Sequence, residues 1–211
     1  MTISDIWSAL LTTGPLETAG VVTGIACVWL AARNSLWNFP TAIISCGLYV
    51  YIFGSSRLYS DMGLQFVFIA LAGYGWYAWL HGDARTQELP VTRTSALVGL
   101  GLLLGVIGYA LGAGFLFDRY TDAAIPYWDT TTTAVSIAAQ ILLARKKLEN
   151  WLIWIAVDVV YVGMYWQKEL YLTSVLYLIY LGLAIYGYLE WRRLMKEKEL
   201  VTSSEAAAVM K

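Results

Sequence analysis

Charged residues are scarce in this chain. Asp, Glu, Lys and Arg make up only 14% of its 211 residues, whereas a soluble domain usually carries about 25%. Hydrophobic residues make up 59%, and apolar stretches of about 17 to 25 residues, long enough to cross a bilayer, recur along almost the whole length. This composition excludes an ordinary soluble domain, and the lack of a basic patch with base-reading side chains excludes nucleic-acid binding. The chain is predicted to be a polytopic protein embedded in membrane lipid.

Histidine and cysteine are also scarce. The single histidine is His81 and there is no HExxH motif, so we expect neither a metal site nor a catalytic triad. Cys27 and Cys46 both lie in apolar stretches and are interpreted as small hydrophobic side chains rather than as a disulfide or metal ligands. The lack of a glycine-rich phosphate loop argues against an ATP-driven pump. We therefore expect no enzyme activity and no cofactor.

Seven apolar stretches have the length of transmembrane helices, so the fold class expected is an all-α membrane protein. They lie near Leu16–Ala32, Leu36–Gly54, Leu58–Leu80, Thr94–Phe117, Asp129–Ala144, Asn150–Trp166 and Leu170–Trp191. Residues 1–15 are amphipathic and too short to span, and we expect a short helix there in the membrane interface. They lack a basic region and a cleavage site, so no removable signal peptide is expected. Residues 193–211 are predicted to form a solvated, partly disordered tail.

Lysine and arginine are distributed unevenly between the two ends of these stretches. One side collects Arg33, Arg85, Arg93, Arg145, Lys146, Lys147, Arg192, Arg193, Lys196, Lys198 and Lys211. The other side has only Arg57, Arg119 and Lys168. Because cytoplasmic loops of membrane proteins are enriched in these residues, the rich side is predicted to be cytoplasmic. The C-terminus then lies inside and the N-terminus outside, which agrees with an odd number of spans.

The chain repeats itself at an offset of 112 residues. Aligning residues 17–79 with 129–191 gives about 19 identities over about 63 positions without a gap. The matched pairs include Arg33 with Arg145, Asn38 with Asn150, Tyr49 with Tyr161, Gly75 with Gly187 and Trp79 with Trp191. Such polar and aromatic matches are more informative than leucine or alanine matches, and internal repeats are common among transporters.

The repeat predicts three helices, one linker helix and three further helices. Because a single span separates them, the two triplets enter the membrane from the same side and are parallel, related by a pseudo-two-fold axis along the membrane normal. We expect an N-terminal segment at 1–15, the first triplet at 16–82, a loop and linker helix at 83–120, the second triplet at 121–192 and the tail at 193–211. Six linker glycines have spacings that fit close helix packing: Gly99, Gly101, Gly105, Gly108, Gly112 and Gly114.

Polar side chains recur inside the predicted spans. On the sixth span a stripe at i, i+4, i+8 and i+11 shares one helix face, formed by Asn150, Trp154, Asp158 and Tyr161. An aspartate facing lipid at mid-span costs about 2.5 to 3.5 kcal/mol, so this stripe is expected to face an interior path. The second span repeats the ends of the stripe as Asn38 and Tyr49.

Other spans carry further polar residues. Gln65 on the third span has Tyr177 as its repeat counterpart on the seventh, and the fifth span places three polar residues on one face. Amides, hydroxyls and rings without a basic partner suit an uncharged or cationic, partly aromatic organic molecule, since ring faces attract positive charge by about 0.5 to 2 kcal/mol. The predicted substrate-lining residues are Gln65, Thr133, Ser136, Gln140, Trp154, Asp158, Tyr161 and Tyr177.

Some of these residues also have a structural interpretation. Asn38 and Asn150 stand near helix starts, so they either cap those helices or form a gate, to which Tyr49 is also assigned. Asp158 has no Lys or Arg at its depth. It either lines the path or is bonded, in its protonated form, to a neighbouring hydroxyl. Proton-coupled transport and a channel-like protein therefore remain alternatives.

Several of these stretches resemble the PnuC family of vitamin transporters. The likeness rests on residues 145–158 (RKKLENWLIWIAVD), the Thr-rich residues 129–140, the run Trp37-Asn38-Phe39-Pro40, residues 58–65 and residues 74–79. It covers nearly all of residues 17–191. The resemblance implies the three-one-three helix fold, similar to that of the SWEET sugar transporters, and a homotrimer in the bacterial inner membrane.

The resemblance also implies a substrate and a mode of transport. Members of the family carry nicotinamide riboside and, in some branches, thiamine or riboflavin. The fifth span with Gln140, followed by Asn150 and Trp154, resembles the nicotinamide riboside branch. Facilitated diffusion is implied, with a cytoplasmic kinase that traps the vitamin on the way to NAD biosynthesis.

Overall fold

The structure, a computed structural model, describes residues 14–55, 59–82, 89–120, 126–167 and 171–209. The predicted interfacial helix at 1–15 therefore lies almost wholly outside the described residues. Those residues form seven α-helices: α2 (Pro15–Ala32), α3 (Asn38–Ser55), α4 (Tyr59–His81), α5 (Ala96–Tyr120), α6 (Pro126–Ala144), α7 (Glu149–Gln167) and α8 (Tyr171–Val209). The prediction of an all-helical chain is confirmed.

Four of the helices are long and apolar enough to cross a membrane, namely those containing Pro15–Ala32, Asp61–His81, Ala96–Tyr120 and Thr173–Val201. The other three, α3, α6 and α7, carry most of the asparagine, threonine and aspartate that the sequence places inside spans. Those residues lower the mean hydropathy of a helix without shortening it. Helix α2 begins at Pro15, one residue before the predicted span, with Gly14 as N-cap and Glu17 in the first turn.

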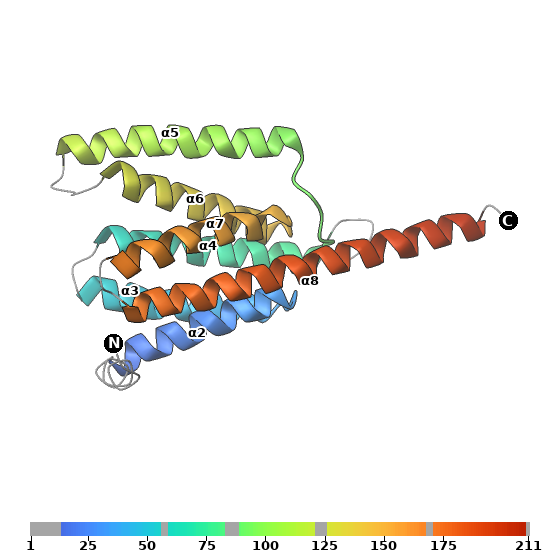
Figure 1. Ribbon diagram of the computed structural model, residues 1–211, viewed down its shortest axis with the longest axis horizontal. Helices are drawn as coiled ribbons and strands as arrows, with labels where there is room; N and C mark the ends of the chain where they lie inside the picture. Colours follow the sequence, from blue (N-terminus) through green and yellow to red (C-terminus); the bar gives the residue numbers. More distant parts are fainter. Residues whose placement is uncertain (1–13, 56–58, 83–88, 121–125, 168–170, 210–211) are drawn as a thin grey trace.

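The last helix differs from the prediction. We expected a partly disordered tail from residue 193, but α8 continues to Val209 and extends well past the other helices (Figure 1). The sequence there is rich in Lys, Glu, Leu and Ala, which are strong helix formers. Arg193 also pairs with Glu190 at 2.6 Å along the helix surface. Helix propensity therefore outweighs the polarity that suggested disorder.

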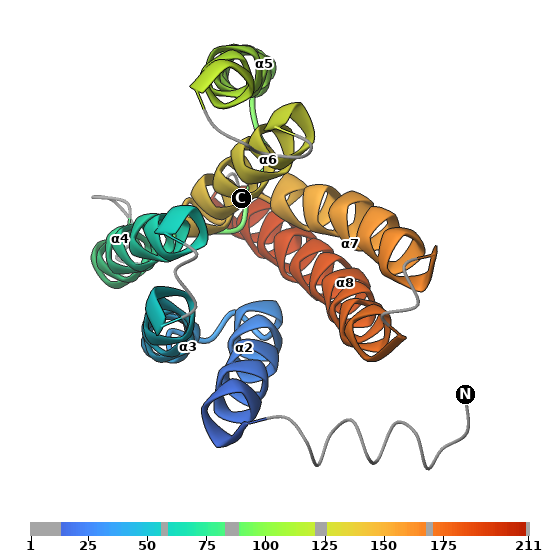
Figure 2. The same ribbon diagram turned by 90° about the vertical axis from the view of Figure 1, so that its left-hand side faces the viewer.

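The helices pack in sequential order within each group of three. Helix α3 packs against both α2 and α4, and α7 packs against both α6 and α8. Between the groups, α2 packs against α8 and α4 packs against α6. Figure 2 shows α3 and α4 on one side of the bundle and α7 and α8 on the other. Each group thus contacts the other through its first and last helices.

Helix α5 lies outside this arrangement. It packs against α6 and makes no comparable contact with another described helix, and both views place it at the margin (Figures 1 and 2). The contact is close at Gly114, where an added Cβ would lie 3.2 Å from Thr130 Oγ1. Thr130 also donates to the Ala110 carbonyl at 3.2 Å. Gly114 thus packs closely against α6, as its spacing suggested. At Gly101, Gly105, Gly108 and Gly112 no described atom of this chain lies within 4 Å of such a Cβ, so close packing at these four stays a prediction.

The loops after α2 and α6 have the same backbone structure. Asn34 and its repeat counterpart Lys146 both adopt positive φ, 55° and 49°. In each loop the following residue donates to the carbonyl five positions earlier: Ser35 to Leu30 and Lys147 to Leu142, both at 2.9 Å. This is the Schellman pattern that ends helices through a left-handed residue. The 112-residue register thus holds at the level of single hydrogen bonds.

The main apolar core lies at the end of the bundle where α2 and α6 end and α3 and α7 begin. We call it the basic end, because Arg33, Arg145 and Lys147 lie there. Its buried residues include five alanines and four large aromatic side chains. Elsewhere many large hydrophobic side chains are exposed, as expected for helices that face lipid.

Candidate functional site

Four aromatic side chains form a cluster at the basic end, called here the basic-end aromatic cluster: Phe39, Trp79, Trp151 and Trp191. All four are buried. Trp79 and Trp191 are 5.9 Å apart between ring centroids, and each meets the remaining ring of its own group edge to face, Phe39 at 4.9 Å and Trp151 at 5.4 Å. Since Phe39 and Trp151 are repeat counterparts, as are Trp79 and Trp191, the cluster is pseudo-symmetric.

Two indole hydrogen bonds join the two groups of helices at this cluster. Trp79 Nε1 in α4 donates to the Ala144 carbonyl at the end of α6, at 3.2 Å. Trp191 Nε1 in α8 donates to the Ala31 carbonyl near the end of α2, at 3.0 Å. Each group therefore supplies one indole and one carbonyl. These two buried hydrogen bonds hold the two groups of helices together at the basic end.

Glycine makes room for the rings. A Cβ at Gly187 would lie 2.7 Å from Trp151 ring atoms, and a Cβ at its counterpart Gly75 would overlap the Phe39 ring. Real Cβ atoms do not approach this closely, so both positions require glycine. The Lys146 ammonium lies 4.2 Å from the centroid of the Trp79 ring, which is cation–π geometry.

The two asparagines predicted as caps or gates bond within their own turns. Asn38 Nδ2 donates to the Ser35 carbonyl and Asn150 Nδ2 to the Lys147 carbonyl, each at 2.6 Å. Both side chains are buried, and Asn150 Oδ1 has no hydrogen-bond partner among the described residues. Their geometry is therefore that of residues that hold the loop together directly beneath the aromatic cluster.

A second aromatic group lies nearer the opposite end, on α7 and α8, and is called here the tyrosine cluster: Tyr161, Tyr165, Tyr177 and Tyr180. Tyr177 is central, with ring centroids 4.8 Å from Tyr161, 5.3 Å from Tyr165 and 6.1 Å from Tyr180. The Tyr165 and Tyr177 rings are stacked, 15° from parallel. Four ring faces and four hydroxyls are thus concentrated in one region of the bundle.

Asp158 lies beside the tyrosine cluster. Its side chain is only 4% exposed, and it lies within electrostatic range of Tyr177 and Tyr180. No ion pair to its carboxyl is formed among the described residues. The sequence contains no Lys or Arg within α2, α3, α4, α6 or α7, and none in α8 before Arg192. Around Asp158 the helices therefore offer a carboxyl group and ring faces without a basic side chain, and the buried Lys146 lies at the basic end, over Trp79.

Helix α2 approaches these tyrosines through two glycines. A Cβ at Gly20 would lie 3.2 Å from the Tyr49 ring, and one at Gly24 would lie 2.8 Å from the Tyr180 hydroxyl. Ser45 of α3 donates to the Gly20 carbonyl at 3.1 Å. Tyr49 lies about 16 Å along α3 from Asn38. It is thus in the region of the tyrosine cluster and away from the asparagines with which we grouped it as a gate.

The remaining predicted lining residues are more scattered. Trp154 packs against the core of the basic end rather than against the tyrosines. Gln65 on α4 and three residues of α6, Thr133, Ser136 and Gln140, are half-buried. The structure thus brings together Asp158, Tyr161 and Tyr177 among the predicted residues. Among the described residues, no hydrogen bond or ring contact joins the other predicted lining residues to these three.

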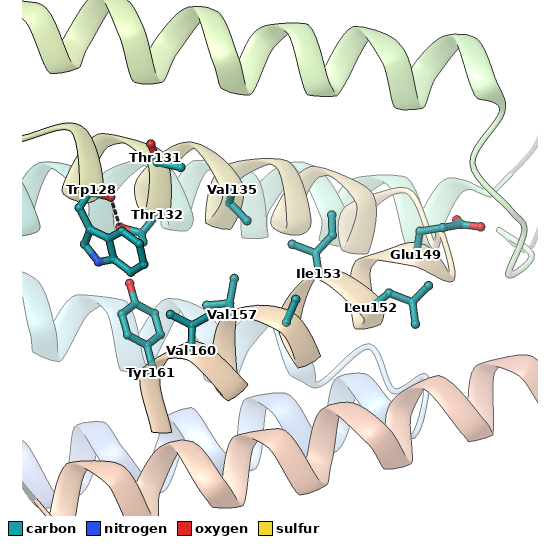
Figure 3. A pocket seen from close by; sticks show the side chains of 11 residues that line it. Trp128, Thr131, Thr132, Val135, Glu149, Leu152, Ile153, Val157, Val160 and Tyr161 are labelled. Carbon is teal, nitrogen blue, oxygen red and sulfur yellow. Dashed lines mark hydrogen bonds between the residues drawn. The ribbon is translucent and has the colours of Figure 1, made fainter. Parts of the chain in front are cut away.

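An open apolar groove of about 430 Å³ runs between α6 and α7. Trp128 and Tyr161 stand at one end and Glu149 at the other, with valine, leucine and isoleucine between them (Figure 3). Tyr161 is the one predicted site residue among its lining side chains. The groove lacks the Asp158 carboxyl and the stacked tyrosine rings, and the carboxylate at its end, Glu149, already accepts two hydrogen bonds from Thr94. It is therefore a weaker candidate for a polar substrate.

Sequence reasoning missed Tyr165, Tyr180, Trp79 and Trp191 as candidate residues. The signal for the two tryptophans was present, because they match each other in the 112-residue register. Tyr165 and Tyr180 have Phe53 and Phe68 as counterparts, so the repeat alone did not single them out.

Comparison with known proteins gives consistent matches. The family model described as "Nicotinamide mononucleotide transporter" matches residues 14–193. The nicotinamide riboside transporter PnuC of Escherichia coli K12 is 28% identical over 208 residues, covering 87% of this chain and 87% of its own. That of Neisseria mucosa is 30% identical, covering 86% and 73%. The riboflavin/roseoflavin transporter RibM of Streptomyces davaonensis is 28% identical, covering 88% and 84%.

A solved structure is also similar. The crystal structure of the vitamin B3 transporter PnuC matches with a TM-score of 0.68 and 27% identity, covering 86% of this chain and 82% of that one. The similarity therefore extends over nearly all the described helices.

Proposed function

Since this chain belongs to the nicotinamide mononucleotide transporter family, we propose that it is a multi-pass transporter of the bacterial inner membrane that carries nicotinamide riboside into the cell. The proposal agrees with the names of the relatives from Escherichia coli and Neisseria mucosa. It involves no catalytic step and no cofactor.

One observation supports the riboside rather than its phosphorylated form as the substrate. The helix interiors carry Asp158 and stacked tyrosines but no Lys or Arg. A phosphate group taken out of water needs cationic partners, and none is provided there. The pyridinium ring of nicotinamide riboside is positively charged, and it suits both a carboxylate and tyrosine faces.

The residues proposed to line the substrate path are those predicted from the sequence together with the tyrosines that the structure adds. They are Gln65, Thr133, Ser136, Gln140, Trp154, Asp158, Tyr161, Tyr165 and Tyr177. Tyr49 belongs to this region, and Asn38 and Asn150 support the gate at the basic end.

The architecture proposed is three helices, a linker and three helices. The first triplet is α2, α3 and α4, the second is α6, α7 and α8, and α5 is the linker that makes them parallel. The equivalent loops after α2 and α6 support this assignment. The excess of Lys and Arg at the basic end supports a cytoplasmic location for it, with the C-terminus inside and the N-terminus outside.

The mechanism proposed is a rocking of the two triplets about a central site. With the basic end closed, the tyrosine cluster receives substrate from outside. Opening to the cytoplasm then breaks the indole bonds to Ala144 and Ala31 and separates Trp79 from Trp191. Buried Asn150 Oδ1 and Trp151 Nε1, which lack partners among the described residues, gain access to water in that state, which offsets part of the cost.

Uptake is proposed to be facilitated diffusion, made directional by a cytoplasmic kinase that phosphorylates the vitamin. The resemblance to the family also supports a homotrimer in the lipid bilayer. Riboflavin is a second candidate substrate because a relative of 28% identity is named as a riboflavin transporter, and thiamine, which also has a cationic ring, is a third.

Counterflow in proteoliposomes tests the proposal. Labelled nicotinamide riboside is expected to exchange, nicotinamide mononucleotide is expected not to, and an imposed pH gradient is expected to leave the rate unchanged. Asp158→Asn keeps the shape but removes the negative charge, and should weaken riboside affinity about tenfold; Asp129→Asn, at the exposed start of α6, is the matched control. Equal exchange of the mononucleotide, or no exchange of the riboside, would refute the assignment.

A further inference from the structure

Two polar groups in the bundle interior lack hydrogen bonds. Hydrocarbon offers no partners, so polar groups of membrane proteins are normally paired inside the protein. Among the described residues neither the Asp158 carboxyl nor the Tyr180 hydroxyl has a hydrogen-bond partner. The two groups lie within electrostatic range of one another. Both are therefore available to a polar ligand in the same region of the bundle.

The position of the Tyr180 hydroxyl is set by the other triplet. Tyr180 extends from α8 to the backbone of α2, where its oxygen would be 2.8 Å from a Cβ at Gly24. The same Cβ position is 3.4 Å from Ser45 Oγ of α3. The position of this hydroxyl therefore depends on how the two triplets pack. Any side chain larger than glycine at position 24 would displace it.

The tyrosine cluster divides into two parts of different chemistry. Tyr161, Tyr165 and Tyr177 present ring faces to one another on α7 and α8. Tyr180 stands apart from this stack, with its ring 6.1 Å from Tyr177 and turned by 73°, so that its hydroxyl points toward α2. A nucleoside has the same two parts, a flat ring and a hydroxylated sugar, joined by one bond.

We propose that Tyr180 is a specificity-determining residue whose hydroxyl, with the Asp158 carboxyl, binds the sugar hydroxyls of the substrate while the neighbouring tyrosines hold its ring. The inference rests on the proposed function and extends it to the orientation of the nucleoside. Asp158 accepts hydrogen bonds from the sugar, and Tyr180 donates or accepts one. A site built to pair with a hydroxyl discriminates strongly against a ligand that lacks it.

Calorimetric titration of the purified protein with two probes tests the proposal. The probes are nicotinamide riboside and the 1-methylnicotinamide cation, which has the same charged ring but no sugar. Tyr180→Phe removes only the hydroxyl, and it should weaken riboside binding about tenfold while changing 1-methylnicotinamide binding less than twofold. Tyr186→Phe, on an exposed part of the same helix, should change neither.

A second variant guards against misfolding of the first. Gly24→Ala keeps the hydroxyl but displaces it, and should reproduce the selective loss for the riboside. Gly47→Ala, where a Cβ meets no described atom within 4 Å, should have no effect. An unchanged ratio of the two affinities in both Tyr180→Phe and Gly24→Ala overturns the inference. Failure of the unaltered protein to bind the riboside would overturn the proposed function instead, and the inference with it.

Discussion

Gly75 and Gly187 show how a single residue type shapes the packing of the basic end. Both stand opposite a buried aromatic ring, and both occupy the same place in the 112-residue repeat. In a helix interior glycine is usually less favourable than alanine, by about 0.5 to 1 kcal/mol. Here the close approach of the ring reverses that preference, because a methyl group would have to displace an indole or a phenyl ring that is itself fully packed.

Gly187→Ala is predicted to lower the free energy of unfolding. The added Cβ would lie 2.7 Å from the Trp151 ring, and such overpacking costs about 1 to 3 kcal/mol. Gly182→Ala in the same helix has no described atom within 4 Å and should be neutral or slightly stabilising. Thermal unfolding in detergent measures both. A midpoint for Gly187→Ala equal to that of Gly182→Ala would contradict the packing described.

At the scale of elements, the segment before α5 is fastened to the start of α7. Thr92 exchanges backbone hydrogen bonds with Lys146 and Leu148, each at 3.0 Å. Glu149 accepts from the Thr94 backbone N–H at 2.8 Å and from its hydroxyl at 2.7 Å. The counterpart of Glu149 in the first triplet is Trp37, which is 70% exposed. The two triplets therefore differ here, and the second is held more firmly.

Removing this attachment should destabilise the protein. Glu149→Ala deletes two hydrogen bonds to a carboxylate, with an expected loss of about 2 kcal/mol or more. Glu197→Ala should cost close to nothing, because Glu197 is an exposed residue with a 3.7 Å surface ion pair to Arg193. Chemical or thermal unfolding compares the two variants. Similar midpoints for both would mean that the attachment contributes little.

At the scale of the whole molecule, the two triplets are joined by reciprocal contacts. Trp79 reaches from the first triplet to the second, and Trp191 reaches from the second to the first. The two indole donors are repeat counterparts, and their acceptors differ by one position in the register, since Ala144 corresponds to Ala32. Because both bonds are buried and similar in length, each is proposed to contribute a similar amount to keeping the basic end closed. A buried hydrogen bond contributes about 1 kcal/mol, which corresponds to about fivefold in the ratio of closed to open molecules.

Trp79→Phe and Trp191→Phe should therefore raise the open population by similar factors, about fivefold each. The reporter is a cysteine replacing Ala184, which is buried in the core of the basic end, in a background without Cys27 and Cys46. Its rate of labelling by an impermeant thiol reagent from the cytoplasmic side measures opening. Trp76→Phe on an exposed part of α4 is the control. An effect of one tryptophan without the other would contradict a reciprocal lock.

The sequence by itself determined which residues form helices and which share a helix face. Apolar length located all seven described helices, and periodicity placed Asp158 and Tyr161 on one stripe of α7. The 112-residue register predicted the equivalence of the loops after α2 and α6. Helix positions and shared helix faces depend on residues close together in the chain, and the loop equivalence follows from the repeat. They can therefore be predicted from helix propensity and residue spacing.

Only the tertiary structure decided which faces meet. Tyr180 contacts Gly24, and Trp191 donates to Ala31 across 160 residues of chain, because α2 packs against α8, and no periodicity specifies that pairing. In the same packed structure Trp154 lies against the basic-end core rather than against the tyrosines. The side-chain amides of Asn38 and Asn150 donate hydrogen bonds within their own turns. Contacts between distant helices depend on how whole surfaces fit, which a pattern along one helix does not contain.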